Sequence, residues 1–175
     1  MGTNIWTYTA FGMNAFSAAY QIVNGGIIVD LNSRDSEEVY SGNPYADDMK
    51  RICAENGADI LIPSYIPEGF KPTDGYGEFD ETSTGNDLLF YFRKNNKKLN
   101  IFVAEYSDTS DLLPVGIPTD HYEISEQIIQ NTLITVMKED DQYTAAFTIN
   151  KTQYIIYSEH LDFDECQRVL YSFFE

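Results

Sequence analysis

The sequence has few of the residues from which catalytic and metal sites are usually built. Its only histidines are His121 and His160, and neither has a cysteine or a second histidine at metal-ligand spacing, so no zinc site is expected. It contains no G-x-S-x-G motif, phosphate-binding loop, dinucleotide fingerprint or EF-hand loop. We therefore predict no catalytic residue, no metal ligand and no cofactor, and we expect a protein that is not an enzyme.

Positive charge is scarce as well. Lysine and arginine total 11 against 28 aspartate and glutamate residues, which gives a formal net charge of −17. Phosphate binding requires a positive surface, so the composition argues against nucleic acid as a partner and against direct binding to anionic lipid headgroups. A basic protein, metal cations or a cationic wall polymer stay open as partners, and so does a surface whose charge only keeps the protein soluble.

The chain has only two cysteines, Cys53 and Cys166. Both fall at inward-looking positions of predicted helices, where buried free thiols are common. A single disulfide is the alternative, because an extracytoplasmic location would permit it. Spacing along the chain does not show whether the two Cα atoms come within bridging distance, so both states stay open.

Charged side chains are absent from residues 1–29, and the first is Asp30. Polar residues interrupt this run, so it does not predict a transmembrane helix, and it lacks the basic start of a signal peptide. Helical periodicity predicts a helix over 11–23, and Ile27–Val29 predicts a short strand. We interpret 1–31 as a juxtamembrane-like segment that follows a spanning helix outside this sequence. The alternative is an ordinary core helix, including one that forms a homodimer contact.

Residues 32–175 predict a single α+β domain. The expected elements are helices over 45–56 and from Asp162 onward, and strands over 60–62, 88–93, 99–106, 121–129, 132–137, 144–149 and 152–158. Asp162 and Glu165 match a capping box at the start of the last helix. Because most successive strands are joined by short links, we expect an antiparallel sheet of about five to seven strands, packed by two or three helices.

Two loops make up the candidate binding surface. The long loop over 107–120 carries Leu112, Leu113, Val115 and Ile117, and the acidic, glycine-rich loop over 74–87 carries Tyr76 and Phe79. Long ordered loops in compact domains are often functional; the alternative is that these apolar residues fold back over the core. The acidic loop could also hold calcium loosely. Four basic residues at the turn over 93–98 could contact an acidic partner or simply be solvated.

Two stretches resemble an uncharacterised family. They are Tyr65–Phe70 (YIPEGF) and Phe147–Tyr157 (FTINKTQYIIY), and the second precedes a short helix that ends at Val169–Phe173. The family is an extracytoplasmic C-terminal domain of Gram-positive bacterial single-pass membrane proteins, and some of its members look like anti-sigma-factor regulators. Where this sequence has Phe147 and Lys151, the family usually has tryptophan and glycine.

The resemblance implies a domain outside the cell that is tethered to the cell membrane, and Asn14–Phe16 is similar to the segment that follows the membrane in this family. It implies a non-catalytic sensing or partner-binding role in a membrane-anchored regulatory protein, with a protein or cell-envelope ligand. It implies no reaction. From the residues alone, three other functions stay open: a small-molecule or lipid carrier, a carboxylate-dependent hydrolase and an acidic inhibitor of a basic protein.

Overall fold

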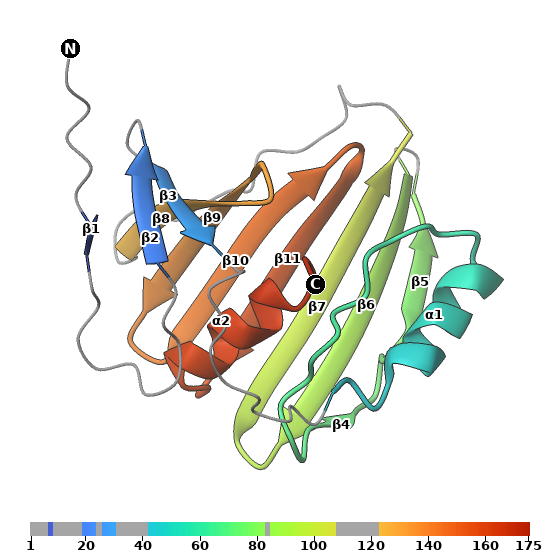
Figure 1. Cartoon of the computed structure of the whole chain (residues 1–175). Coiled ribbons are helices and arrows are strands. Elements are labelled where there is room, and N and C mark those ends of the chain that lie inside the picture. The colour runs from blue at the N-terminus through green and yellow to red at the C-terminus, as the bar shows by residue number, and fades with distance from the viewer. Residues whose placement is uncertain (1–6, 9–18, 24–25, 31–41, 83–84, 108–122) are drawn as a thin grey trace.

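The computed structural model describes residues 7–8, 19–23, 26–30, 42–82, 85–107 and 123–175. Within these ranges the chain has the α+β fold that the sequence predicts, with two helices and one sheet. Figure 1 shows both helices on the same face of the sheet. The opposite face is not covered by either helix, and we call it the uncovered face.

Eight strands form the antiparallel part of the sheet. In chain order they are β4 (Lys71–Pro72), β5 (Glu78–Glu81), β6 (Gly85–Lys94), β7 (Lys97–Tyr106), β8 (Glu123–Ile129), β9 (Thr132–Glu139), β10 (Gln142–Ile149) and β11 (Thr152–Glu159). Their order across the sheet is β8-β9-β10-β11-β7-β6-β4, and β5 also pairs with β6. The sheet is larger than predicted because it includes two short strands that we did not predict, and one of them, β5, lies within the acidic loop over 74–87.

Asparagine and aspartate form the tight turns of the sheet. Asn95, Asn131, Asp140 and Asn150 have φ angles of 55°, 65°, 42° and 56°. These residue types tolerate the left-handed region because their short polar side chains can bond to the local backbone. Each of the four lies in a two-residue link between consecutive strands. Such short links fix the strand register and therefore decide which side chains point to each face.

The core lies between the sheet and the helices α1 (Ala46–Glu55) and α2 (Phe163–Tyr171). Side chains from both helices and four of the strands are fully buried there: Met49, Phe90, Leu99, Ile134, Ile156 and Leu170. The YIPEGF stretch contributes Ile66 and Phe70 to the same core. Burial of large apolar side chains is worth roughly 1.5–3 kcal/mol each, so this face supplies most of the stability of the fold.

The N-terminal segment contains strands where we predicted a helix over 11–23. The structure has β1 (Thr7–Tyr8), β2 (Ala19–Val23) and β3 (Gly26–Asp30), so the prediction is wrong over 19–23, and residues 11–18 lie outside the described ranges. The β3 strand confirms the predicted strand at 27–29 and pairs in parallel with β8. The sequence AYQIV favours a strand because aromatic and β-branched residues suit a pleated sheet.

Two smaller predictions are also wrong. Residues 60–62 do not form a strand, because the backbone N–H of Leu61 donates to the Tyr154 hydroxyl at 2.9 Å and Pro63 has no N–H to continue a ladder. Asp162 is the N-cap of α2, but its side chain makes no capping hydrogen bond. The carboxylates of Asp162 and Glu165 instead lie 3.7 Å from the Lys97 ammonium group.

Both cysteines are free and buried. The Cys166 Sγ atom lies 2.9 Å from the Ser158 Oγ atom inside the core. Burial raises the pKa of the Cys53 thiol and of the Cys166 thiol to about 11. Because the thiolate is the reactive form of cysteine, neither residue is suited to act as a nucleophile at neutral pH.

Candidate functional site

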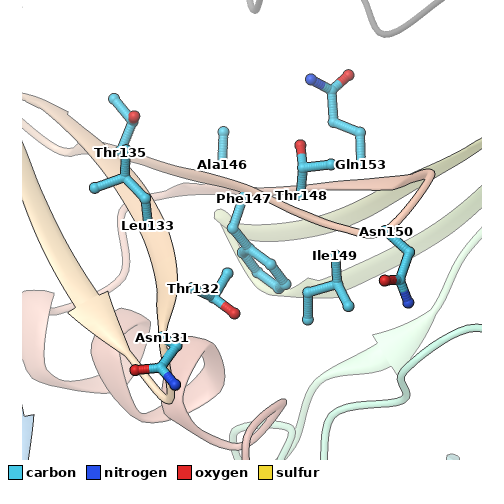
Figure 2. A pocket seen from close by; sticks show the side chains of 10 residues that line it. All are labelled: Asn131, Thr132, Leu133, Thr135, Ala146, Phe147, Thr148, Ile149, Asn150 and Gln153. Carbon is cyan, nitrogen blue, oxygen red and sulfur yellow. The ribbon is translucent and has the colours of Figure 1, made fainter. Parts of the chain in front are cut away.

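Strands β9 and β10 separate before they end. Their pairing stops at Ile134 and Phe147. On its other side, β9 stays paired with β8 as far as Thr132, and β10 stays paired with β11 as far as Ile149. Residues 132–133 and 148–149 therefore have no partner on the strand that they face, and Figure 2 shows the two strands diverging there. We call this opening, bounded by 132–133 and 148–149, the fork.

The fork opens into a hollow of about 550 Å³. Its lining residues are Asn131, Thr132, Leu133, Thr135, Ala146, Phe147, Thr148, Ile149, Asn150 and Gln153. None of them carries a charge, although the chain as a whole is strongly acidic. Leu133 is 52% exposed, which is high for a large apolar side chain. The hollow thus offers hydroxyl and amide groups that can hydrogen-bond to a ligand, beside an accessible apolar surface.

The strand register assigns the fork side chains to two faces. Figure 2 shows Thr135, Ala146, Thr148 and Gln153 on one side of the strands, while Phe147 points to the other side. The first four belong to the uncovered face, because they alternate with core residues along their strands. The hollow can therefore be reached from the face that carries no helix.

The base of the fork is held by aromatic packing on the helix side of the sheet. The Phe147 ring stacks on Tyr154, with centroids 4.8 Å apart and planes inclined by 9°. The rings of Phe173 and Phe174, at the C-terminal end of the chain, lie 5.7 Å and 5.1 Å from it. This contact fixes β10 against β11 at the point where β10 leaves β9, so the opening is part of the packed structure.

Residues 60–172 match the family described as Domain of unknown function (DUF4367). The chain belongs to this family. The match includes the YIPEGF stretch, the fork and nearly all of the antiparallel sheet, whereas α1 and the strands β1–β3 lie outside it. Comparisons with curated proteins and with solved structures give no significant match.

Neither helix in the described part of this DUF4367 protein is long and apolar enough to cross a membrane. The two hairpin strands that bound the fork, β9 and β10, both lie within the residues that match the family. The strands and the lining residues of the fork thus lie within the matched residues, whereas Phe173 and Phe174, which pack at its base, lie just beyond them.

The predicted binding surface is only partly described. Leu112, Leu113, Val115 and Ile117 lie outside the described residues. Tyr76 packs edge-on against Phe90 and Phe92, with ring centroids 5.4 Å and 5.3 Å apart, and burial raises the pKa of its hydroxyl. Phe79 also packs against the core. These two aromatic residues attach the loop to the sheet and do not form a common site with the fork.

The basic turn between β6 and β7 is bound to the rest of the protein. The Lys94 ammonium group donates to the Glu68 carbonyl oxygen at 2.7 Å, and the Lys98 ammonium group pairs with the Glu159 carboxylate at 2.5 Å. Arg93 donates to Asn100 at 3.3 Å. With Lys97 beside two acids of α2, all four predicted basic residues have partners within the chain. Their charges stabilise the fold locally, and they do not form a free cationic patch.

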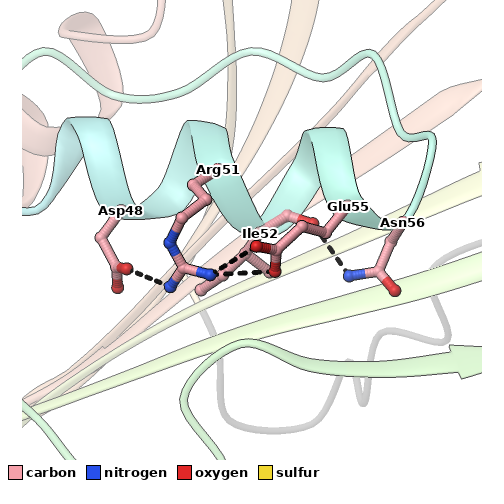
Figure 3. Close-up of polar contacts among 5 residues, drawn as sticks. All are labelled: Asp48, Arg51, Ile52, Glu55 and Asn56. Atoms are coloured by element: carbon pink, nitrogen blue, oxygen red, sulfur yellow. Dashed lines mark hydrogen bonds and ion pairs between the residues drawn. The ribbon is translucent and has the colours of Figure 1, made fainter.

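Helix α1 carries an exposed network of charges, shown in Figure 3. Arg51 pairs with Asp48 at 2.5 Å and with Glu55 at 2.8 Å, and these two partners raise the pKa of its guanidinium group. Asn56 closes the helix by donating its side-chain amide to the Ile52 carbonyl oxygen at 2.8 Å. Such i,i+3 and i,i+4 pairs contribute only tenths of a kcal/mol, so this surface is explained by helix stability.

Two aspartates face each other at the edge of the sheet. Asp80 on β5 lies directly opposite Asp87 on β6. Burial raises the pKa of the Asp87 carboxyl, and the charge of Asp80 adds to the rise. The two aspartates do not line the fork hollow. The described ranges hold no group of three or more His, Cys, Asp or Glu side chains that could bind a metal ion, so the calcium hypothesis gains no site there.

His160 fastens a turn to the end of β11. Its Nδ1 atom contacts the Asp141 carboxylate, and its backbone N–H donates to the Asp141 carbonyl oxygen at 2.8 Å. Its Nε2 atom lies 3.6 Å from Glu159. Glu159 is also bonded to Lys98, and this bond is the main reason why the pKa of its carboxyl is lowered. Both imidazole nitrogens therefore face acids, in a contact that joins the β9–β10 turn to the end of the neighbouring strand β11.

Sequence reasoning missed every residue of the fork. Thr148 and Leu133 lie in segments that it correctly interpreted as strands, but it could not show that the two strands separate before their ends. The available signal was compositional: in this acidic chain the start of β9, the end of β10 and the turns at Asn131 and Asn150 lack acidic residues. The divergence itself depends on how far the sheet twists, which no local pattern encodes.

Proposed function

We propose that this DUF4367 domain is a non-catalytic binding module, and that it senses or recruits a partner for a membrane-anchored regulatory protein outside the cell. The fork supports the binding role, because it combines a sizeable hollow with uncharged hydrogen-bonding groups and an exposed apolar side chain. The extracellular location and the tether are supported by the resemblance of the Tyr65–Phe70 and Phe147–Tyr157 stretches.

The chemistry of the fork favours binding over a reaction. Threonine hydroxyls and asparagine amides hydrogen-bond to a ligand, but at neutral pH none of them exchanges a proton as a general acid or base. The lining contains no residue that could activate a threonine as a nucleophile. The hollow can therefore select a ligand by shape and hydrogen bonding.

Introducing a charge into the fork tests this proposal. Thr148 is exposed, so Thr148→Glu should fold normally and should abolish ligand binding by placing a carboxylate in the hollow. Ala54→Glu places the same charge on the exposed surface of α1 and serves as the matched control. Amide NMR spectra of the 20.0 kDa chain would be recorded during titration with fractionated cell-envelope extract. Shifts at 132–133 and 148–149 that Thr148→Glu removes and Ala54→Glu preserves would support the proposal.

The tether is tested separately. A protease added to intact cells should cleave the domain of the full-length protein, whereas a cytoplasmic control protein should stay intact. Protection of the domain in intact cells, with cleavage only after lysis, would overturn the proposed location. That result would leave the binding role of the fork unaffected.

A carboxylate-dependent hydrolase is the second candidate, and one observation favours it. Asp80 and Asp87 are adjacent, and the pKa of the Asp87 carboxyl is raised, as expected for a general acid paired with an ionised partner. Asp87→Asn should then abolish hydrolysis of an envelope polysaccharide. If Asp87→Asn and the wild-type chain both leave such substrates intact, the hydrolase hypothesis fails and the binding module stands.

A further inference from the structure

The two edges of the fork differ from ordinary strand ends. In an antiparallel sheet each interior strand is paired on both sides. At 132–133 and 148–149 the outer side of each strand is paired, but the inner side, which faces the fork, has no strand partner among the described residues. Unpaired strand edges are templates for another extended chain. Here two such edges face each other across one hollow.

We propose that the fork binds an extended, uncharged peptide segment, which enters between β9 and β10 and pairs with their separated ends. This inference rests on the proposed binding function and names its ligand. Addition of a strand to an exposed sheet edge is a common mode of peptide recognition, in which main-chain hydrogen bonds supply the affinity. The fork would hold the segment from both sides, so only a chain that is extended at this point fits.

The lining of the hollow defines the side chains that such a peptide carries. Successive residues of a strand point to opposite faces. Residues on one side would meet Leu133, Ala146 and Thr148, and those on the other would meet Phe147 and Ile149. Both sets are uncharged, so a charged residue entering the fork would lose its hydration without gaining an opposite charge. The expected ligand alternates threonine or another small polar residue with an aliphatic one.

The nearest basic side chain does not change this preference. Lys151 follows Asn150 in the turn beside the hollow, but its ammonium group donates to the Ser107 carbonyl oxygen at 2.7 Å. It is absent from the lining of the hollow. An acidic peptide would therefore find no cation within the fork, and the overall charge of −17 would repel it during approach.

The experiment uses the full chain and a defined probe. The probe is the acetylated and amidated pentapeptide Thr-Val-Thr-Val-Thr, titrated while amide NMR spectra are recorded. We expect the largest shifts at Leu133 and Thr148. Two control peptides carry proline or glutamate in place of the central threonine. The first loses a main-chain donor and the second brings a charge, so each should bind at least about tenfold more weakly.

Protein variants provide the second control. Thr148→Glu should weaken binding of the probe at least about tenfold, while Ala54→Glu should leave the dissociation constant unchanged. Equal binding of the proline peptide, or shifts confined to residues outside the fork, would overturn the proposal. So would preferential binding of the uncharged trisaccharides maltotriose or chitotriose at the same amides, because the fork would then be a carbohydrate site.

The outcome also separates this inference from the proposed function. If envelope extract shifts the fork amides but the probe peptide does not, the peptide inference is wrong and the binding function is retained. If neither the extract nor the peptide shifts these amides, both are wrong.

Discussion

Replacing Phe147 by alanine tests whether the aromatic cluster holds the fork. The Phe147 side chain is 3% exposed and is surrounded by Tyr154, Phe173 and Phe174 at centroid distances of 4.8, 5.7 and 5.1 Å. Removal of a buried phenylalanine side chain costs about 3–5 kcal/mol because it combines lost transfer free energy with a cavity. Loss of three ring contacts places the expected cost at the upper end of this range.

The free energy of unfolding would be measured by urea denaturation. A domain of this size has a stability of about 5–15 kcal/mol, so a loss of about 5 kcal/mol in Phe147→Ala should remove between roughly a third and all of it. Phe147→Leu keeps most of the volume and should remain folded, with a smaller loss. In that variant the amides of 132–133 and 148–149 should also shift, because the base of the fork has changed.

Phe163→Ala is the matched control. The Phe163 side chain is 39% exposed and contacts one aromatic ring, that of Tyr143 at 5.6 Å. The Lys138 ammonium group also lies 5.1 Å from its ring centroid. Because the side chain is partly exposed, its removal should still cost less than about 3 kcal/mol, the lower value for a buried phenylalanine. If Phe147→Ala costs as little as Phe163→Ala, the cluster does not fix β10, and our account of a rigid fork is wrong.

Three further predictions concern charges, thiols and turns. Asp87→Asn should stabilise the protein at neutral pH by roughly 0.2–1 kcal/mol, because it removes a like-charge cross-strand pair. The folded-state pKa of the Asp87 carboxyl is raised, so this gain, measured by urea denaturation, should shrink as the pH falls through that pKa. Burial raises both thiol pKa values from 9.0 to about 11, so the thiols should not affect stability below pH 9.0 and should lower it between 9.0 and about 11. A Cys53→Ala, Cys166→Ala double variant should therefore lose less stability than the wild-type chain over this range. Because the φ angle of Asn150 is positive, Asn150→Ala should lower the free energy of unfolding by about 1 kcal/mol, whereas Asn150→Gly should be nearly neutral. An unchanged midpoint of thermal unfolding in Asn150→Ala would contradict the assigned turn.

The parts of the fold that the sequence predicted are those with local causes. The alternation of Leu99, Ile101 and Val103 marks β7 as a strand with one buried face, and the stripe of Cys166, Val169 and Leu170 marks α2. Each pattern lies within a single element, so its period alone is informative. These elements, and the hairpins between them, were sufficient to predict the α+β fold.

The failures have physical reasons in contacts between different elements. Over 11–23 apolar residues lie at helical spacing, but 19–23 pair with 26–30. In the sequence, Asn24-Gly25 stands between these strands, and this dipeptide is typical of a two-residue hairpin. Asp162 has the right position for a cap, but Lys97 from a distant strand lies within reach of its carboxylate. The first failure comes from pairing with the neighbouring strand, and the second from a partner remote in sequence.

The candidate site could not be predicted because it arises where the pairing of β9 with β10 stops before the strands end. Leu133 and Thr148 look like ordinary strand residues, and only the register of four neighbouring strands shows that they lack a partner across the fork. By contrast, the basic turn at Lys94–Lys97 attracted attention in the sequence, yet its charges are satisfied within the chain. Patterns of charge were therefore poorer guides to the site than the pairing of backbones.

The two free thiols have a consequence for how the protein is made. Because the core closes over Cys53 and Cys166 without a bridge between them, the native state needs no oxidant and no disulfide isomerase during biogenesis. The chain should reach the same fold in a reducing expression host as in an oxidising compartment, and reducing agents in a purification buffer should leave it intact.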